Sequence, residues 1–339
     1  MRTLFRRHED EMKKNLRYLS VFVVLFAAFA WANNTSLFSN ASGDGRPVLL
    51  AHRGLAQTFS REDLRNDTCT ASRIDPPDHP HIENTLPSME AAFAAGADIV
   101  ELDVHPTTDG AFAVFHDWTL DCRTDGNGRT RDHTLAELQA LDIGYGYTAD
   151  GGATFPFRGK GVGPMPSLDA VLTAFPSRRF LINVKSNDAD EGEKLAAYIA
   201  GLEPQSRARL MVYGGTLPVE AVHDALPEIP IGSNRSLKDC LIRYALIGWT
   251  GRVPSACRKG VMLVPLNVAP WLWGWPHRFM ERMHAAGVQV FVLGPYDGTY
   301  GTTGIDRREQ LDRLPKGFNG GIWTNRIDRI APAIRTAGK

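Results

Sequence analysis

The sequence predicts an α/β fold, a single (β/α)8 barrel of the TIM type that is distorted by a hairpin at its second and third strands. Short apolar runs typical of strands alternate with segments of helical spacing, which favours a parallel sheet. At 339 residues the chain is long enough for one large barrel or two ordinary domains, and the alternation favours the barrel. The 32 glycines and 21 prolines suit many short loops between strands and helices.

The first strand and helix set the direction of the sheet. Val48–Ala51 is a short buried-type strand, and a helix is expected over Glu83–Ala95, with Thr85 and Ser88 in its first turn. This helix leads to a second strand that begins at Ile99, so the two strands form a parallel βαβ unit. The turn at Asp109-Gly110 is too short for a crossover, so the next run pairs as a hairpin outside the eight barrel strands.

The rest of the chain repeats this alternation. A loop insertion is expected over residues 55–82, a capped helix begins at Thr134 with Glu137 three residues later, and the glycine-rich stretch 143–163 is either a lid or a surface excursion. Helices are expected over Glu191–Leu202 and His277–Ala286. Six further strands are expected, at Arg179–Lys185, Arg209–Tyr213, Ile229–Ile231, Val261–Val264, Val288–Val292 and Gly321–Thr324.

The N-terminus differs from the rest of the chain. Basic residues precede an uncharged run from Tyr18 to Ala32, and Ala30-Trp31-Ala32 offers small residues for signal-peptidase cleavage. Residues 1–32 are therefore predicted to be a signal peptide or membrane anchor, 33–46 a flexible spacer and 47–339 the barrel domain. A cleaved leader predicts a periplasmic or secreted protein, an uncleaved one predicts membrane association through residues 18–32, and a buried helix is the third interpretation.

Charge and cysteine content narrow the function further. Lys plus Arg equals Asp plus Glu, 38 against 38, so no overall field attracts nucleic acid. In an exported protein the four cysteines favour disulfides. Pairing Cys69 with Cys122 would hold the insertion beside the strand ends, and pairing Cys240 with Cys257 would close a local loop. Four unpaired buried thiols are the alternative.

Polar side chains gather where the first strands end. Glu101, Asp103 and His105 alternate along one strand and share a face, and two adjacent carboxylates indicate either a bound cation or a solvent-exposed edge. His52-Arg53 and His116-Asp117 end two other strands. Histidines, an arginine and acids together can hold a cation, bind an anion and move protons, which suits phosphoryl transfer.

The order of these motifs resembles that of a known family. His52-Arg53-Gly54, Glu83-Asn84-Thr85, Glu101-Leu102-Asp103-Val104, Thr108-Asp109-Gly110 and His116-Asp117 resemble the signature of the glycerophosphodiester phosphodiesterases. Two later segments, Leu120–Gly128 and Met165–Leu172, resemble the family as well, and the resemblance is strong over residues 48–185. It implies metal-dependent hydrolysis of a small-molecule glycerophosphodiester.

The resemblance also implies roles for individual residues. Glu101 and Asp103 would bind one divalent cation, Mg²⁺ or Ca²⁺, and His52 and His116 would act as general base and acid. Arg53 and Lys185 would bind phosphate. Glu83 is expected either to support the site or to ligate the cation directly, while His105 matches no catalytic position and is expected to be structural or supporting.

Two positions depart from the family pattern. Asn183, two residues before Lys185, stands where the family usually has a third carboxylate ligand, and an asparagine can ligate only through its neutral carbonyl oxygen. Asn325 follows Thr324 where the family usually has aspartate. Asn183 predicts a more weakly held cation, and the two losses together leave open a different metal, a different substrate or a loss of activity.

Two alternatives to hydrolysis stay open, and so does the role of one aromatic cluster. A lyase-type phospholipase or sugar phosphodiesterase would use a substrate hydroxyl as nucleophile and form a cyclic phosphate. An inactive relative would only bind a phosphodiester. The aromatic cluster Trp271–Trp275 could line a headgroup pocket, contact a lipid interface or simply pack under a loop.

Overall fold

Eight parallel strands form a nearly closed barrel in the computed structural model, which describes residues 2–39, 46–65, 67–161, 163–257, 259–298, 301 and 303–337. The neighbours run in the order β6-β5-β4-β2-β1-β9-β8-β7, and a single parallel bridge from Ile231 to Gly260 joins the two outer strands. The barrel prediction is therefore confirmed. The strands are β1 Val48–His52, β2 Ile99–Pro106, β4 Arg179–Val184, β5 Leu210–Gly214, β6 Ile231–Ser233, β7 Val261–Pro265, β8 Gln289–Leu293 and β9 Gly321–Thr324.

The expected hairpin is also present. The short strand β3, Phe112–Val114, pairs antiparallel with the end of β2 and lies outside the barrel path. Its register places Val104 opposite Val114. The chain therefore delivers His116 directly beside the carboxyl end of β2.

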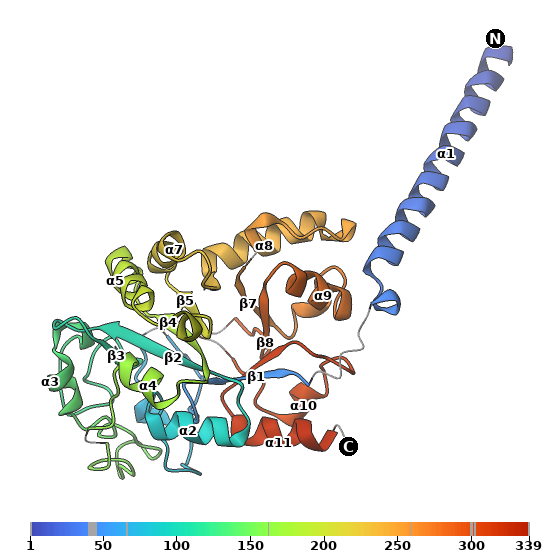
Figure 1. The fold of residues 1–339 in the computed structure, drawn as a ribbon. Coiled ribbons are helices and arrows are strands. Elements are labelled where there is room, and N and C mark those ends of the chain that lie inside the picture. Colours follow the sequence, from blue (N-terminus) through green and yellow to red (C-terminus); the bar gives the residue numbers. More distant parts are fainter. Residues whose placement is uncertain are drawn as a thin grey trace.

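Helices surround the strands (Figure 1). Caps define where several of them begin: Thr85 accepts from the Ser88 amide at the start of α2, and Ser233 does the same for Ser236 at the start of α8. The longer helices are α2 Leu86–Ala95, α4 Leu168–Ala174, α5 Ala189–Ala200, α7 Thr216–Ala225, α8 Asn234–Ile247, α9 His277–Ala285 and α11 Ile327–Ala337. The shorter ones are α3 Leu135–Gln139, α6 Pro204–Arg207 and α10 Arg308–Leu311.

Two apolar layers hold the barrel. One lies between the strands and the helices and includes Phe93, Phe180 and Ile182. The other fills the barrel interior with seven side chains, namely Leu50, Ile99, Leu181, Met211, Val261, Phe291 and Trp323. Because this interior is filled with large side chains, polar groups can gather only above it, at the carboxyl ends of the strands.

The insertion at residues 55–82 is a loop, as expected, with one 3₁₀ turn at Ala71–Arg73. A disulfide joins Cys69 to Cys122 and a second joins Cys240 to Cys257, which confirms both expected pairings. The stretch 143–163 buries Tyr147 and Phe157 beside this insertion. None of its described residues lines the pocket at the strand ends described below, which favours the surface excursion over the lid.

The N-terminal helix α1, Arg2–Asn34, extends away from the barrel (Figure 1). Within the described chain, only its Glu11–Asn34 portion is long and apolar enough to cross a membrane. Its last turns contact the barrel domain: the Phe26 and Trp249 rings pack in a tilted arrangement with centroids 4.9 Å apart, and Arg282 donates to the Asn33 carbonyl at 2.6 Å. Residues 40–45 of the expected spacer lie outside the described residues, and the division into leader, spacer and barrel stays a prediction.

Candidate active site

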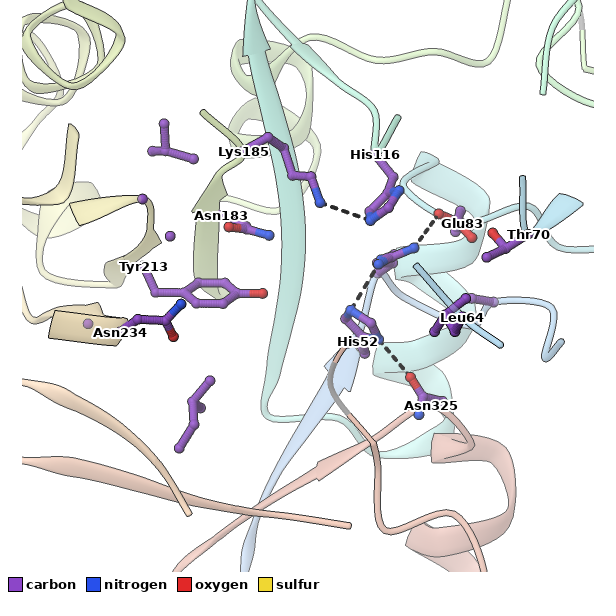
Figure 2. A pocket seen from close by; sticks show the side chains of 18 of the residues that line it. His52, Leu64, Thr70, Glu83, His116, Asn183, Lys185, Tyr213, Asn234 and Asn325 are labelled. Carbon is purple, nitrogen blue, oxygen red and sulfur yellow. Dashed lines mark hydrogen bonds and ion pairs between the residues drawn. The ribbon is translucent and has the colours of Figure 1, made fainter. Parts of the chain in front are cut away.

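The register of the strands brings the predicted residues together at one end of the barrel. His52 on β1 lies opposite Glu101 on β2, and Asp103 lies opposite Asn183 on β4, which in turn lies opposite Tyr213 on β5. These side chains form a polar layer above the apolar interior. Figure 2 shows Lys185, Tyr213 and His52 around the same cavity.

His52 is held from both sides of its ring. Its Nδ1 lies 2.6 Å from the Asn325 Oδ1, and its Nε2 accepts from the Arg53 Nε at 3.1 Å. Burial, together with the positive charge of Arg53, lowers the pKa of His52 to about 3. The ring is therefore neutral at pH 7 and can accept a proton.

His116 has a different pair of neighbours. Its Nδ1 lies 2.6 Å from a carboxylate oxygen of Asp117, and its Nε2 lies 2.9 Å from the Lys185 Nζ. Burial and the charges of Arg53 and Lys185 lower the pKa of His116 to about 4. The carboxylate on Nδ1 acts in the opposite direction and favours an imidazolium.

Arg53 lies between the histidines. Its Nη1 donates to Glu83 at 2.8 Å and its Nε lies 3.2 Å from Asp103. Lys185 lies 3.7 Å from the other oxygen of Asp103, so Asp103 links the two cations. Arg53 has a φ of 59°, and the Gly54 that follows has no room for a Cβ, which would lie 2.6 Å from the Ser88 Oγ. This tight turn directs the guanidinium into the site.

Glu101 and Asp103 are both fully buried, and they differ in charge balance. Lys185 and Arg53 lower the pKa of Asp103 despite its burial. Burial and the neighbouring Asp103 raise the pKa of Glu101 to about 8. Glu101 accepts from the Tyr213 hydroxyl at 2.5 Å, and its other oxygen accepts from the Arg53 backbone amide at 3.2 Å. Arg53 and Lys185 both lie against Asp103, so Glu101 is the carboxylate of the pair that is left short of positive charge.

The missing positive charge beside Glu101 indicates that a divalent cation would fit this site. Oxygen donors and an unbalanced carboxylate are what Mg²⁺ or Ca²⁺ require, so Glu101 and Asp103 fit. Asn183 lies beside them with its Nδ2 donating to Asp103 at 2.8 Å. Nowhere in the described part of the chain do three or more His, Cys, Asp or Glu side chains form a metal-binding group, so the site offers two acids and neutral donors.

A buried arginine, Arg123, contacts the acids that pair with His116 and Arg53. Arg123 donates to Asp117 at 2.8 Å, pairs with Glu83 at 3.0 Å, and donates to the Tyr147 hydroxyl and the Thr70 hydroxyl. Glu83 thus joins Arg123 to Arg53. In the sequence, Arg123 stands only within a family-like motif, and nothing there signals this role.

A pocket of about 1090 Å³ opens above these groups. Its lining includes His52, Arg53, Glu83, His116, Asn183, Lys185, Tyr213 and Asn325. His105 is buried outside it, with its Nε2 3.3 Å from the His116 carbonyl. Trp271, Trp273 and Trp275 are absent from the lining, and Trp275 packs against the core instead. Tyr213 is the lining residue that strand-end reasoning could have selected, since it lies near the end of β5.

Comparisons with known proteins match this geometry. Residues 52–201 match the model of the glycerophosphoryl diester phosphodiesterase family. A glycerophosphodiester phosphodiesterase of Caldanaerobacter subterraneus is 36% identical over 261 residues, which are 76% of this chain and 93% of that protein.

Solved structures share the fold. The glycerophosphoryl diester phosphodiesterase domain of the Mycobacterium tuberculosis protein Rv2277c has a TM-score of 0.60 at 17% identity, over 84% of this chain and 98% of that one. An Oleispira antarctica phosphodiesterase in complex with the product sn-glycerol-3-phosphate has a TM-score of 0.55 at 20% identity, over 85% and 97% of the two chains. The family match and the 36% identical relative show that this chain belongs to the glycerophosphodiester phosphodiesterase family, whose members are phosphoric diester hydrolases.

Proposed function

We propose that this protein hydrolyses a glycerophosphodiester to glycerol phosphate and an alcohol, with His52 and His116 transferring the protons. The observation that carries the proposal is the pair of imidazoles on either side of two cations, Arg53 and Lys185, in one pocket. A guanidinium and an ammonium suit the two non-bridging oxygens of a phosphodiester. The product complex of the Oleispira antarctica phosphodiesterase supports glycerol phosphate as a product here.

In the proposed reaction, His52 takes a proton from water and the water oxygen attacks phosphorus. The bond from phosphorus to the alcohol oxygen breaks, and His116 gives its proton to that oxygen. His52 suits the base because Asn325 occupies its Nδ1, so the lone pair of the neutral ring is on Nε2, which accepts from Arg53 in the free site. His116 suits the acid because the Asp117 carboxylate stabilises the imidazolium.

Substrate binding favours the protonated form of His116. In the free site Arg53 and Lys185 lower its pKa. A phosphodiester anion bound between these cations offsets their field and raises the pKa towards neutrality. The substrate therefore brings the general acid into its active protonation state.

Glu101 and Asp103, with the Asn183 amide as a neutral donor, are the residues that would hold one divalent cation, Mg²⁺ or Ca²⁺. The raised pKa of Glu101 supports this, because an added positive charge would balance the buried pair. Ligation by Asn183 requires its amide to turn so that the oxygen replaces the Nδ2 that now faces Asp103. When bound, the cation would supply positive charge to a phosphate oxygen.

The proposal includes an exported location, periplasmic or secreted, or held at the membrane by α1. Two disulfides and the apolar N-terminal helix support it, because disulfides persist in oxidising compartments.

The test is an assay of purified protein against a panel of glycerophosphodiesters with Mg²⁺, Ca²⁺ or neither. His52→Ala and His116→Ala are each expected to lower kcat by roughly 10² to 10⁴-fold, the usual contribution of a general acid or base. His284→Ala, on the exposed side of α9, is the matched control and keeps wild-type rates. Full activity in either active-site variant would remove that histidine from the mechanism.

A further inference from the structure

We infer that Asp306 is a positioning residue for His52 and acts through Asn325; the inference rests on the proposed role of His52. Three side chains form a continuous chain of hydrogen bonds. The His52 Nδ1 lies 2.6 Å from the Asn325 Oδ1, and the Asn325 Nδ2 donates to an Asp306 carboxylate oxygen at 2.8 Å. Figure 2 shows the link from His52 to Asn325 at the end of β9.

The chemistry of an amide explains why Asp306 is needed. A carboxamide has one end that accepts and one that donates, and the two ends have nearly the same shape. A carboxylate only accepts, so Asp306 selects the orientation in which the amide NH₂ of Asn325 points at it. The oxygen of Asn325 then faces His52, whose Nδ1 must carry the proton.

The orientation of the Asn325 amide determines which nitrogen of His52 can accept a proton. With the proton on Nδ1, the neutral ring has its lone pair on Nε2, where it accepts from the Arg53 Nε in this structure. If the amide of Asn325 turned over, its NH₂ would face Nδ1 and the proton would move to Nε2. That tautomer cannot take a proton from water at Nε2.

Asp306 is itself fixed by several contacts. The oxygen that does not contact the Asn325 side chain accepts from the Asn325 backbone amide at 2.6 Å and from the Thr324 hydroxyl at 3.0 Å. The Asp306 amide donates to the Gln310 side chain at 2.8 Å, and the Ile305 amide donates to the Trp323 carbonyl at 2.8 Å. The loop before α10 is thereby tied to β9.

Gly304 makes this approach possible. A Cβ at this position would overlap the Asp306 carboxylate and would lie 2.6 Å from the Asn325 Nδ2. Any other residue would push the two groups apart. The glycine therefore belongs to the same arrangement as Asp306 and Asn325.

The arrangement also bears on the aspartate that the family usually carries at position 325. Here the negative charge comes from a neighbouring loop and acts on His52 through an amide. The charge lies one side chain farther away, and the hydrogen-bond direction at Nδ1 is kept.

The test is a reciprocal exchange of the two side chains. Asp306→Asn removes the selecting charge at nearly constant volume, and Asn325→Asp sets two carboxylates facing each other. Each single variant is expected to lose about 10- to 100-fold in kcat with KM within about twofold, because the base is misoriented while the phosphate site is intact. In the double variant the new amide at position 306 donates to the new carboxylate at position 325, which accepts from His52, and kcat returns to within about threefold of wild type.

A spectroscopic readout separates positioning from general stability. Long-range ¹H–¹⁵N correlation spectra of His52 should show the Nδ1-protonated tautomer in the wild type and the double variant, and a mixture in Asp306→Asn. Thermal unfolding of each variant is measured alongside. Asp312→Asn, an exposed acid near the end of α10, serves as the matched control and should change neither the spectrum nor kcat.

The outcomes distinguish this inference from the proposed function. If His52→Ala is inactive while Asp306→Asn keeps wild-type kcat and tautomer, or if the two single losses simply multiply in the double variant, the inference is wrong and the proposed function stands. If His52→Ala keeps full activity, the proposed role of His52 fails first.

Discussion

His52 and His116 are the same residue type, and their neighbours give them different chemistry. An amide oxygen lies against the Nδ1 of His52, whereas a carboxylate lies against the Nδ1 of His116. A carboxylate stabilises an imidazolium and an amide does so less, so the two rings differ in their tendency to hold a second proton. This difference is the basis for assigning His52 as base and His116 as acid.

The charge at position 183 should control how tightly a cation binds. Asn183→Glu adds a third carboxylate beside Glu101 and Asp103, and it is expected to tighten Ca²⁺ or Mg²⁺ binding by roughly 10-fold or more, since affinity follows the number of charged ligands. Isothermal titration calorimetry measures this without turnover. The added repulsion should also lower the Tm of the metal-free protein.

Asn183→Gln lengthens the side chain without a charge and is the control for that variant. It should leave cation affinity at or below the wild-type value. Equal tightening by Gln and Glu would show that length, and not charge, limits binding at this site.

Arg123 should set the pH dependence of stability around His116. Although burial opposes it, Arg123 lowers the pKa of both Glu83 and Asp117. Groups with lowered pKa stabilise the fold at neutral pH, and this contribution is lost as pH falls below about 4 through their folded-state pKa values. Removing Arg123 leaves Glu83 with Arg53 alone and Asp117 with His116 alone, and breaking such a buried pair costs about 3–5 kcal/mol.

Arg123→Met should therefore reverse the pH trend. Without their partner the buried carboxylates acquire raised pKa values, so the folded variant binds more protons than the unfolded chain and gains stability as pH falls from 7 to 5. Denaturant unfolding at pH 7, 5 and 3 measures this, with exposed Arg129→Met as control. A variant that loses stability steadily with acid, as the control does, would contradict this account.

Residues at strand ends could be predicted from the sequence, and residues that depend on loop placement could not. His52, His116 and Lys185 line one pocket, and Glu101 and Asp103 are buried next to it, because a parallel barrel brings its strand ends together. Asp306 lies in an irregular loop, and only the tertiary contact with Asn325 makes it part of the site.

At the level of elements, the apolar pattern predicted that a strand or helix exists better than it predicted where that element begins and ends. The fifth barrel strand, β6, was expected at Ile229–Ile231 and occupies Ile231–Ser233. That expectation was two residues too early, because pairing with β5 sets the register and the short run does not reveal it. The turn at Asp109-Gly110, in contrast, predicted β3 correctly because its length permits only a hairpin.

The two disulfides should have separable effects. Replacing Cys69 and Cys122 with Ser frees the insertion, whose Phe59, Leu64 and Thr70 line the pocket, so KM should rise along with a stability loss of about 2–4 kcal/mol. Replacing Cys240 and Cys257 should cost a similar amount of stability and leave KM within about twofold. Steady-state kinetics of both double variants compares them directly, and an equal rise in KM would contradict the positioning role of the insertion.

Over the whole molecule, the barrel concentrates reactive groups at one end because its interior is closed by apolar side chains. The cations Arg53 and Lys185 and the acids Glu101 and Asp103 share that end, so a phosphodiester held by the two cations, as we propose, would lie beside both imidazoles. The N-terminal helix α1 lies outside this machinery.

The most direct measurement of the central claim is phosphorus NMR of the reaction of a glycerophosphodiester in ¹⁸O-enriched water. Hydrolysis with water as nucleophile predicts glycerol phosphate whose ³¹P signal carries the isotope shift of one ¹⁸O. A cyclic phosphate product, or glycerol phosphate without the label, would contradict it.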